Sequence, residues 1–394
     1  DERAIVLYNN AYNTTRGYIH TSTAINVGDA DKPRLVRRTL VEALGLSTDD
    51  NCFYAFRNYQ SGLEYIRPAR QLAEGGLFAE LYAYQYQAFL DFREIRDTDG
   101  SWRALEQRLG GGGTFSLDEA YRELQLEPIL KPCRVLINPG MLRELLSNYP
   151  GSRERFCTAI TEFYESVNHF VGTAIDLKPI IHRSCARLEA LAATRAAAGR
   201  QEIPLVSDSP VPESGPALLT ELDHVVIVWL MLEALGEFAD SADRTPPAVI
   251  AATRFDQWLL HKVINAAFNE LLGDGDIAYW DSRLVLILLT HIDQLTLTDG
   301  DDLGESFHRT LMDVNIQKYL QLHSYNNSYW LNKERLERMT ATLICMHRIS
   351  TQADNTPGEI DLDEVQKNAQ HLLSVAEQAG YQIEKMLKLL AKTQ

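Results

Sequence analysis

The sequence contains few cysteines and spaces them widely. Five occur in 394 residues, and no two of them form a Cys-x-x-Cys pair. This spacing matches neither a disulfide framework nor a zinc site, so it favours free thiols in a reducing, cytoplasmic setting. The five are Cys52, Cys133, Cys157, Cys185 and Cys345.

Long hydrophobic runs are also missing. The longest, VVIVWLML at 225–232, has the length of a core helix and falls well short of the roughly 20 residues that span a bilayer. The opening residues, DERAIVLYNN, lack the basic and apolar regions of a signal peptide. We therefore expect no membrane partner.

Positive charge is scarce as well. Lys and Arg total 38 against 54 Asp and Glu, which gives a net charge of -16. Nucleic-acid binding needs Lys and Arg concentrated on one face, so we expect no nucleic-acid partner. Apolar residues make up 45% and charged residues 23%, the composition of an ordinary globular protein.

The patterning predicts an α+β chain. Residues 1–97 form a β-rich module with short β-type runs and one helical pattern at 32–46. The last run, 78–95, is predicted as a long strand or a bulged pair. The predicted strands are 4–8, 18–27, 52–57, 62–67 and 78–95.

Residues 98–394 are predicted to form a large all-α region. Apolar residues recur there at helical spacing from Trp102 to the C-terminal part of the chain. The segment 199–216, GRQEIPLVSDSPVPESGP, is rich in Pro, Ser and Gly and is predicted to be a mobile loop. Gly110 to Gly113 is predicted to be a hinge between the β part and the helices.

Spaced catalytic and metal-binding motifs are lacking. There is no His-Glu-x-x-His and no Gly-x-Ser-x-Gly, and the histidines of the helical region lie singly. Arg254-Phe255-Asp256 lies in a helical pattern, where no strand presents its carboxylate. We therefore predict no catalytic residue, no metal and no cofactor in this chain.

Aromatic residues are plentiful in two places. Tyr82, Tyr84 and Tyr86 alternate along the predicted strand at 78–95, with Phe78 and Phe92 on the same face. The pattern favours a core face packed under helices, and the alternative is a surface that stacks on sugar rings.

A second aromatic cluster lies in a predicted loop between two helices. Exposed rings with neighbouring amides suit sugar or partner contact, whereas helix-capping Asn and a buried Trp are the structural alternative. The cluster comprises Tyr319, Tyr325, Tyr329 and Trp330 with Asn326, Asn327 and Asn332. Its candidate contact residues are Tyr325, Asn326, Asn327, Tyr329 and Trp330.

Two blocks carry a resemblance to a known family. The first comprises YNNAYNTTRGYIHTS at 8–22, FRNYQSGLEYIR at 56–67 and GGLFAELYAYQYQAFLDFREIRD at 75–97. The second is VNIQKYLQLHSYNNSYWLNKERLERM at 314–339. They resemble the region after the catalytic barrel in long bacterial α-amylase-type enzymes of glycoside hydrolase family 13. Tyr18 and Leu331 depart from that pattern, which has Trp and Phe there.

The resemblance implies a non-catalytic C-terminal region. Its partners would be the catalytic barrel, absent from this chain, and α-glucan. The β module would pack on that barrel and stabilise it, and the helical part would place substrate or dock partners. Two other classes stay open, namely a helical protein-interaction scaffold and a stand-alone enzyme of unrecognised type.

Overall fold

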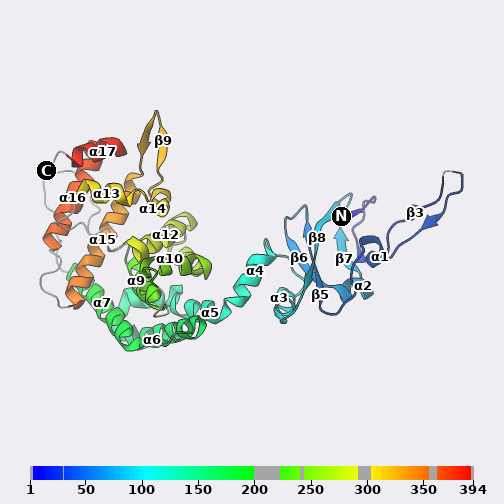
Figure 1. The fold of residues 1–394 in the computed structure, drawn as a ribbon, viewed down its shortest axis with the longest axis horizontal. Helices are drawn as coiled ribbons and strands as arrows, with labels where there is room; N and C mark the ends of the chain where they lie inside the picture. The colour runs from blue at the N-terminus through cyan, green and yellow to red at the C-terminus, as the bar shows by residue number, and fades with distance from the viewer. Residues whose placement is uncertain are drawn as a thin grey trace. The chain divides into compact units, whose positions relative to one another are not determined.

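A computed structural model describes residues 3–29, 31–198, 222–239, 244–291, 303–354 and 362–391. The chain divides into two compact units, Asp1–Glu127 (unit 1) and Pro128–Gln394 (unit 2). A β-rich part precedes a large helical part (Figure 1), so the predicted α+β class is confirmed. The loop predicted at 199–216 lies outside the described residues.

Unit 1 is built on a four-stranded antiparallel sheet in the order β1-β8-β5-β6. The strand β5 alternates Tyr54 and Phe56 on one face with Phe53 and Ala55 on the other, and all four are buried. The sheet is therefore covered on both faces. Its strands are β1 (Ile5–Tyr8), β5 (Cys52–Asn58), β6 (Glu64–Pro68) and β8 (Tyr86–Arg96).

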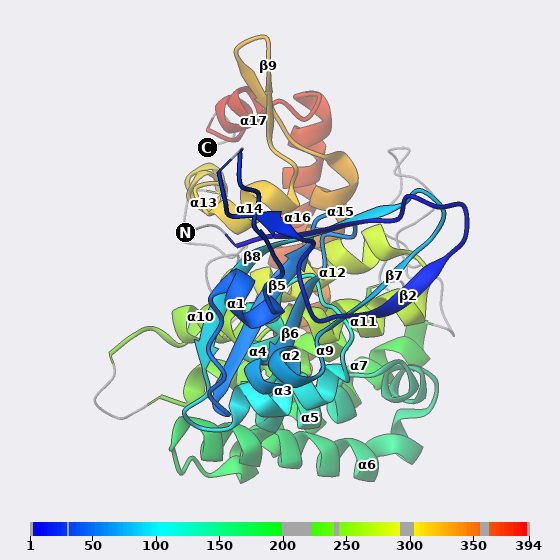
Figure 2. The same cartoon turned by 90° about the vertical axis from the view of Figure 1, so that its right-hand side faces the viewer.

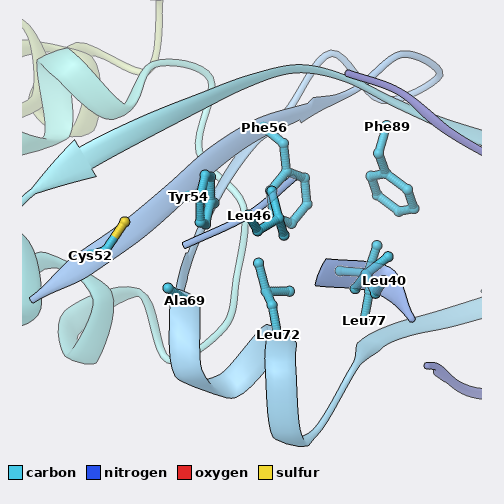
Figure 3. Packing of buried hydrophobic residues seen from close by; sticks show 9 residues of the cluster. All are labelled: Leu40, Leu46, Cys52, Tyr54, Phe56, Ala69, Leu72, Leu77 and Phe89. Atoms are coloured by element: carbon cyan, nitrogen blue, oxygen red, sulfur yellow. The ribbon is translucent and has the colours of Figure 1, made fainter. Parts of the chain in front are cut away.

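One face of the sheet packs against two short helices, α1 (Leu40–Leu44) and α2 (Ala69–Glu74). Figure 3 shows Phe56 among the apolar side chains from this sheet and these helices. Its ring stacks on Phe92 with centroids 4.9 Å apart and meets Phe89 edge-on at 5.6 Å. Aromatic burial thus holds this side of the sheet together.

The other face packs against α3 (Ser101–Leu109) and α4 (Leu117–Gln125). Ser116 caps α4, as its side chain accepts from the backbone N–H of Glu119. The strand-to-helix change after Arg96 was predicted, yet unit 1 extends beyond residue 97 because α3 and α4 bury their apolar faces on this sheet.

The glycine loop at 110–113 connects α3 to α4 and contacts the sheet. The Arg67 side chain donates a hydrogen bond of 2.6 Å to the carbonyl of Gly111, and Thr114 pairs with Glu64. A Cβ on Gly113 would lie 2.8 Å from the Tyr65 ring. The predicted hinge at the β–α boundary is therefore wrong, because this loop is an internal part of unit 1.

Four shorter strands complete unit 1. They form two antiparallel pairs, β2 with β7 and β3 with β4. The helix predicted over 32–46 is wrong in its first half, because helix α1 begins only at Leu40, where the N-cap Thr39 forms a capping box with Glu42 in the first turn. The strands are β2 (Thr15–Ile19), β3 (Ile25–Asn26), β4 (Leu35–Val36) and β7 (Leu77–Leu81).

In its described residues, unit 2 is helical apart from one β-hairpin, β9 (His323–Tyr325) and β10 (Ser328–Trp330). None of its described helices is long and apolar enough to cross a bilayer. The longest, α6, kinks at Asn148, where the backbone leaves helical geometry ahead of Pro150. The helices are α5 (Glu127–Leu136), α6 (Pro139–Val171), α7 (Leu177–Ala198), α9 (Asp223–Leu232), η1 (Glu233–Glu237), α10 (Pro247–Gln257), α11 (Leu260–Leu272), α12 (Gly275–His291), α13 (Leu303–Thr310), α14 (Val314–Tyr319), α15 (Lys333–Asp354), α16 (Leu362–Gln378) and α17 (Ile383–Leu390).

Helix α9 forms the centre of unit 2. Its residues 225–232 are apolar and buried, as expected for a helix segment that is surrounded on all sides. Asp223 and His224 at its start are buried as well. It contacts α6, α7, α12 and α15. The Tyr164 hydroxyl of α6 donates to the backbone carbonyl of Met231 in α9.

A buried polar cluster joins three of these helices. The Asp281 carboxylate in α12 lies 2.8 Å from His224 Nε2 in α9 and accepts hydrogen bonds of 2.6 and 2.8 Å from Arg338 in α15. Asp281 is 1% exposed. Each charge is therefore compensated by a partner from another helix.

His347 in α15 makes the stability of unit 2 sensitive to pH. Its ring is buried, and its Nε2 has no hydrogen-bond partner among the described residues. Burial lowers the pKa of His347 below its ordinary value. His347 therefore binds a proton at a higher pH in the unfolded chain than in the folded chain. The free energy of unfolding falls as the pH drops from the unfolded pKa of His347 to its folded pKa.

We expect the free energy of unfolding of the wild type to fall more steeply than that of His347→Leu as the pH drops below about 6.5, the pKa of an unfolded His. The difference in slope should be up to ~1.4 kcal/mol per pH unit. Urea titrations at several pH values measure the slope. His308→Leu is the control, since that side chain is exposed. Equal slopes in wild type and His347→Leu would contradict the assignment.

Candidate functional site

The second aromatic cluster forms a β-hairpin and not the predicted loop. Tyr325 pairs with Ser328, and Tyr329 pairs with Ser324. Asn326 and Asn327 make the turn with φ of 49° and 58°, the left-handed conformation that a two-residue type I′ turn requires and Asn tolerates. Figure 2 shows the hairpin labelled β9 projecting from the surrounding helices of unit 2.

The base of the hairpin is held by two neighbouring segments. The backbone N–H of Tyr329 donates to the Glu384 carboxylate of α17, and Trp330 forms a β-bridge with Gln382. Asn332 caps α15 by accepting from the N–H of Arg335. The hairpin is therefore a positioned element of unit 2.

The predicted contact residues are divided between the two faces of the hairpin. Side chains alternate along each strand, so Tyr325 shares a face with Trp330, whereas Tyr329 lies on the opposite face. Tyr325 and Tyr329 are 65% and 55% exposed. Trp330 is half-buried, and Asn326 and Asn327 are exposed. The structure thus offers one Tyr–Trp face and one face with a single Tyr.

An open groove of about 570 Å³ runs beside the start of β9. Trp280 is fixed at its edge, because the Arg335 guanidinium lies 3.9 Å from its ring centroid and its Nε1 donates to Asp276. The described lining carries rings, amides and one ammonium but no carboxylate. Its residues are Tyr279, Trp280, Val314, Gln317, Lys318, Gln321 and Leu322.

The sequence did not identify this groove. Trp280 and Gln317 come from separate helices, and no local motif indicates that they meet. The segment that follows the hairpin contacts the groove lining, since the Asn332 side chain donates to Gln321 Oε1 at 3.0 Å. Rings that stack on apolar faces and amides that bond hydroxyls are suited to binding a neutral polar ligand such as a sugar.

The tyrosines at 82–86 lie on the surface of unit 1. The core assignment favoured by the sequence is wrong, because Tyr82, Tyr84 and Tyr86 are 61%, 59% and 48% exposed. The predicted alternation along one strand is wrong as well. Tyr82 and Tyr84 lie in the turn between β7 and β8, where Tyr84 has a φ of 55°.

The buried side chain of Asn9 holds this tyrosine turn against the loop after β1. Its amide donates to the carbonyls of Asn13 and Tyr82 at 2.8 and 2.9 Å, and its carbonyl accepts from the N–H of Ala11. The exposed rings gathered there form a tyrosine surface, which we define as Tyr8, Tyr12, Tyr82, Tyr84 and Tyr86.

The Arg254-Phe255-Asp256 motif makes structural contacts, and so does the Glu64 carboxylate in β6. The Arg254 side chain donates to the backbone carbonyls of Leu235 and Phe238, and Asp256 lies 3.3 Å from Arg283. Glu64 accepts from Arg57 at 2.6 Å and from the N–H of Leu117. Across the described ranges, no group of three or more His, Cys, Asp or Glu side chains is placed to hold a metal.

Comparisons with protein-family models, with curated proteins and with solved structures each gave no match.

Proposed function

We propose that this chain is a non-catalytic accessory region of an α-glucan-acting glycoside hydrolase, similar to the region after the barrel in long α-amylase-type enzymes of family 13. The observation that carries the proposal is the Tyr325–Trp330 face of the hairpin beside the groove edged by Trp280. Exposed aromatic rings next to amide groups are what glucan binding requires.

The tyrosine surface of unit 1 is the proposed contact with the catalytic barrel of the same polypeptide. Exposed aromatic patches of this kind mark interaction sites, because a ring in water gains free energy when another surface covers it. Five free cysteines among the described residues accord with the reducing, cytoplasmic compartment that we propose. Membrane and nucleic-acid partners form no part of this function.

Affinity electrophoresis tests the glucan contact. We expect the chain to be retarded in native gels that contain glycogen or soluble starch, and Tyr325→Ala to raise the apparent dissociation constant about tenfold. Tyr329→Ala is the matched control from the opposite face of the hairpin and should have a smaller effect. Trp330→Ala tests the second ring of the binding face.

Tyr59→Ala, an exposed tyrosine in unit 1, controls for general effects on mobility. Mobility that is identical with and without glucan would contradict the sugar contact. The aromatic hairpin would then be a protein-docking element, as the helical-scaffold alternative requires.

A further inference from the structure

Two cysteines that are distant in sequence meet between helices α6 and α7. The Sγ atoms of Cys157 and Cys185 lie 2.7 Å apart, although 28 positions separate them in the chain. Both thiols are free. The two helices pack against each other and are joined by the short segment after Gly172. Their thiols are therefore close enough for a bond to form with little movement of the backbone.

The two thiols differ in their access to solvent. Cys157 is half-buried and lines an open groove of about 650 Å³ along α6, beside Arg153 and Glu154. Cys185 is 4% exposed, and burial raises the pKa of its thiol to about 12. A small oxidant in water thus reaches Cys157 first.

The surroundings of Cys185 hold it in place. Tyr149 donates a hydrogen bond of 2.9 Å to the backbone carbonyl of Cys185. Burial raises the pKa of the Cys185 thiol and that of the Tyr149 hydroxyl. The positive charge of Arg153 lowers both pKa values and so opposes the effect of burial. Cys52, Cys133 and Cys345 lie on other elements, namely β5, α5 and α15.

We propose that Cys157 and Cys185 form a reversible disulfide when a hydroperoxide oxidises the chain. The Cys157 thiol loses its proton to water, and the thiolate attacks the peroxide O–O bond. The thiolate becomes a sulfenic acid, and the leaving hydroxide or alkoxide takes up a proton and departs as water or an alcohol. The Cys185 sulfur then attacks the sulfenic sulfur, the S–S bond forms, and water leaves with the proton of Cys185. Two thiols and one peroxide give one disulfide, and a thiol reductant reverses the step.

The bond would link α6 to α7 covalently. It closes a loop of about 30 residues and so restricts the unfolded chain more than the folded one. We expect the oxidised chain to show a melting temperature higher by about 5–10 °C for unit 2. This inference does not depend on the proposed function, because it concerns no ligand.

Peptide mapping of the full chain after treatment with hydrogen peroxide tests the pairing. Trypsin cleaves after Arg183, which separates Cys157 in the peptide 156–183 from Cys185 in the peptide SCAR at 184–187. We expect these two peptides to be joined in the oxidised sample and separate after reduction. The number of thiols that titrate in denaturant should fall from five to three on oxidation.

Cys157→Ser and Cys185→Ser should each abolish the joined peptides and the rise in melting temperature. Cys345→Ser is the matched control, a buried cysteine of the same unit, and should leave both unchanged. Five titratable thiols after oxidation, or peptides joined through other cysteines, would overturn the proposal. So would a rise in melting temperature that persists in Cys157→Ser.

Discussion

Asp281→Ala is expected to lower the free energy of unfolding of unit 2 by about 3–5 kcal/mol. The substitution leaves Arg338 and His224 without the carboxylate that both contact within 2.8 Å. Because Asp281 is buried, water cannot replace it without disrupting the packing of three helices. Urea titration followed by helical circular dichroism measures the loss.

Two further variants test whether the loss of stability comes from uncompensated buried charge and not from removal of a carboxylate in general. Glu305→Ala removes an exposed carboxylate that lies 3.7 Å from Arg309, and should change stability by under about 0.5 kcal/mol. Replacing His224, Asp281 and Arg338 together by Leu, Leu and Met should recover most of the loss, since no uncompensated charge then remains. A loss below about 1 kcal/mol for Asp281→Ala would refute this account of the cluster.

Phe56→Ala is expected to have a comparable effect on unit 1, about 3–5 kcal/mol. The ring is 2% exposed and contacts Phe89, Phe92 and Tyr65. Its removal leaves a cavity between the sheet and the two helices α1 and α2 that these rigid neighbours cannot fill. We expect amide exchange in β5 and β8 to quicken by about two to three orders of magnitude.

Hydrogen exchange read by mass spectrometry distinguishes the units in this experiment. Peptides from α11 in unit 2 should keep their wild-type rates, because unit 1 has its own core. Phe115→Ala is the control, since that ring is 81% exposed. Unchanged protection in β5 would show that the aromatic contacts are not what stabilises the sheet.

Much of the fold could be predicted from sequence periodicity, and particular residues explain where this failed. The strand predicted at 52–57 has an unbroken pattern and was found within a residue. The helical spacing predicted to start at Trp102 was found to start at Ser101. The segment 32–46 has helical spacing throughout, but the Thr39–Glu42 capping box decides where the helix starts. Local hydrogen bonds at a helix end outweigh periodicity in so short a segment.

The tyrosines illustrate a second limit. Alternation at 82, 84 and 86 matches a strand, but β7 ends at Leu81 and Tyr84 takes a left-handed conformation in the turn that follows. A bulky residue with positive φ is uncommon, so nothing in the sequence signals this turn. Likewise, the hairpin at 323–330 was placed in a loop because its strands are only three residues long. The adjacent pair Asn326-Asn327 was the available signal.

Only part of the candidate site could be predicted from the sequence. Tyr325 and Tyr329 were identified as a cluster, but their separation onto opposite faces follows from the pairing register. Trp280 and the Cys157–Cys185 pair depend on contacts between different helices. Tertiary packing sets such contacts, and a single sequence carries no local trace of it.

The burial of α9 has a consequence for how the chain is synthesised. Helices α6 and α7 precede it, whereas α12 and α15 follow it. While the ribosome adds the residues from 233 to 354, the segment VVIVWLML at 225–232 has only part of its final surroundings. Incompletely covered apolar surface of this kind binds chaperones or aggregates. Unit 2 therefore completes its folding only after α15 emerges, which favours slow elongation or chaperone cover over that interval.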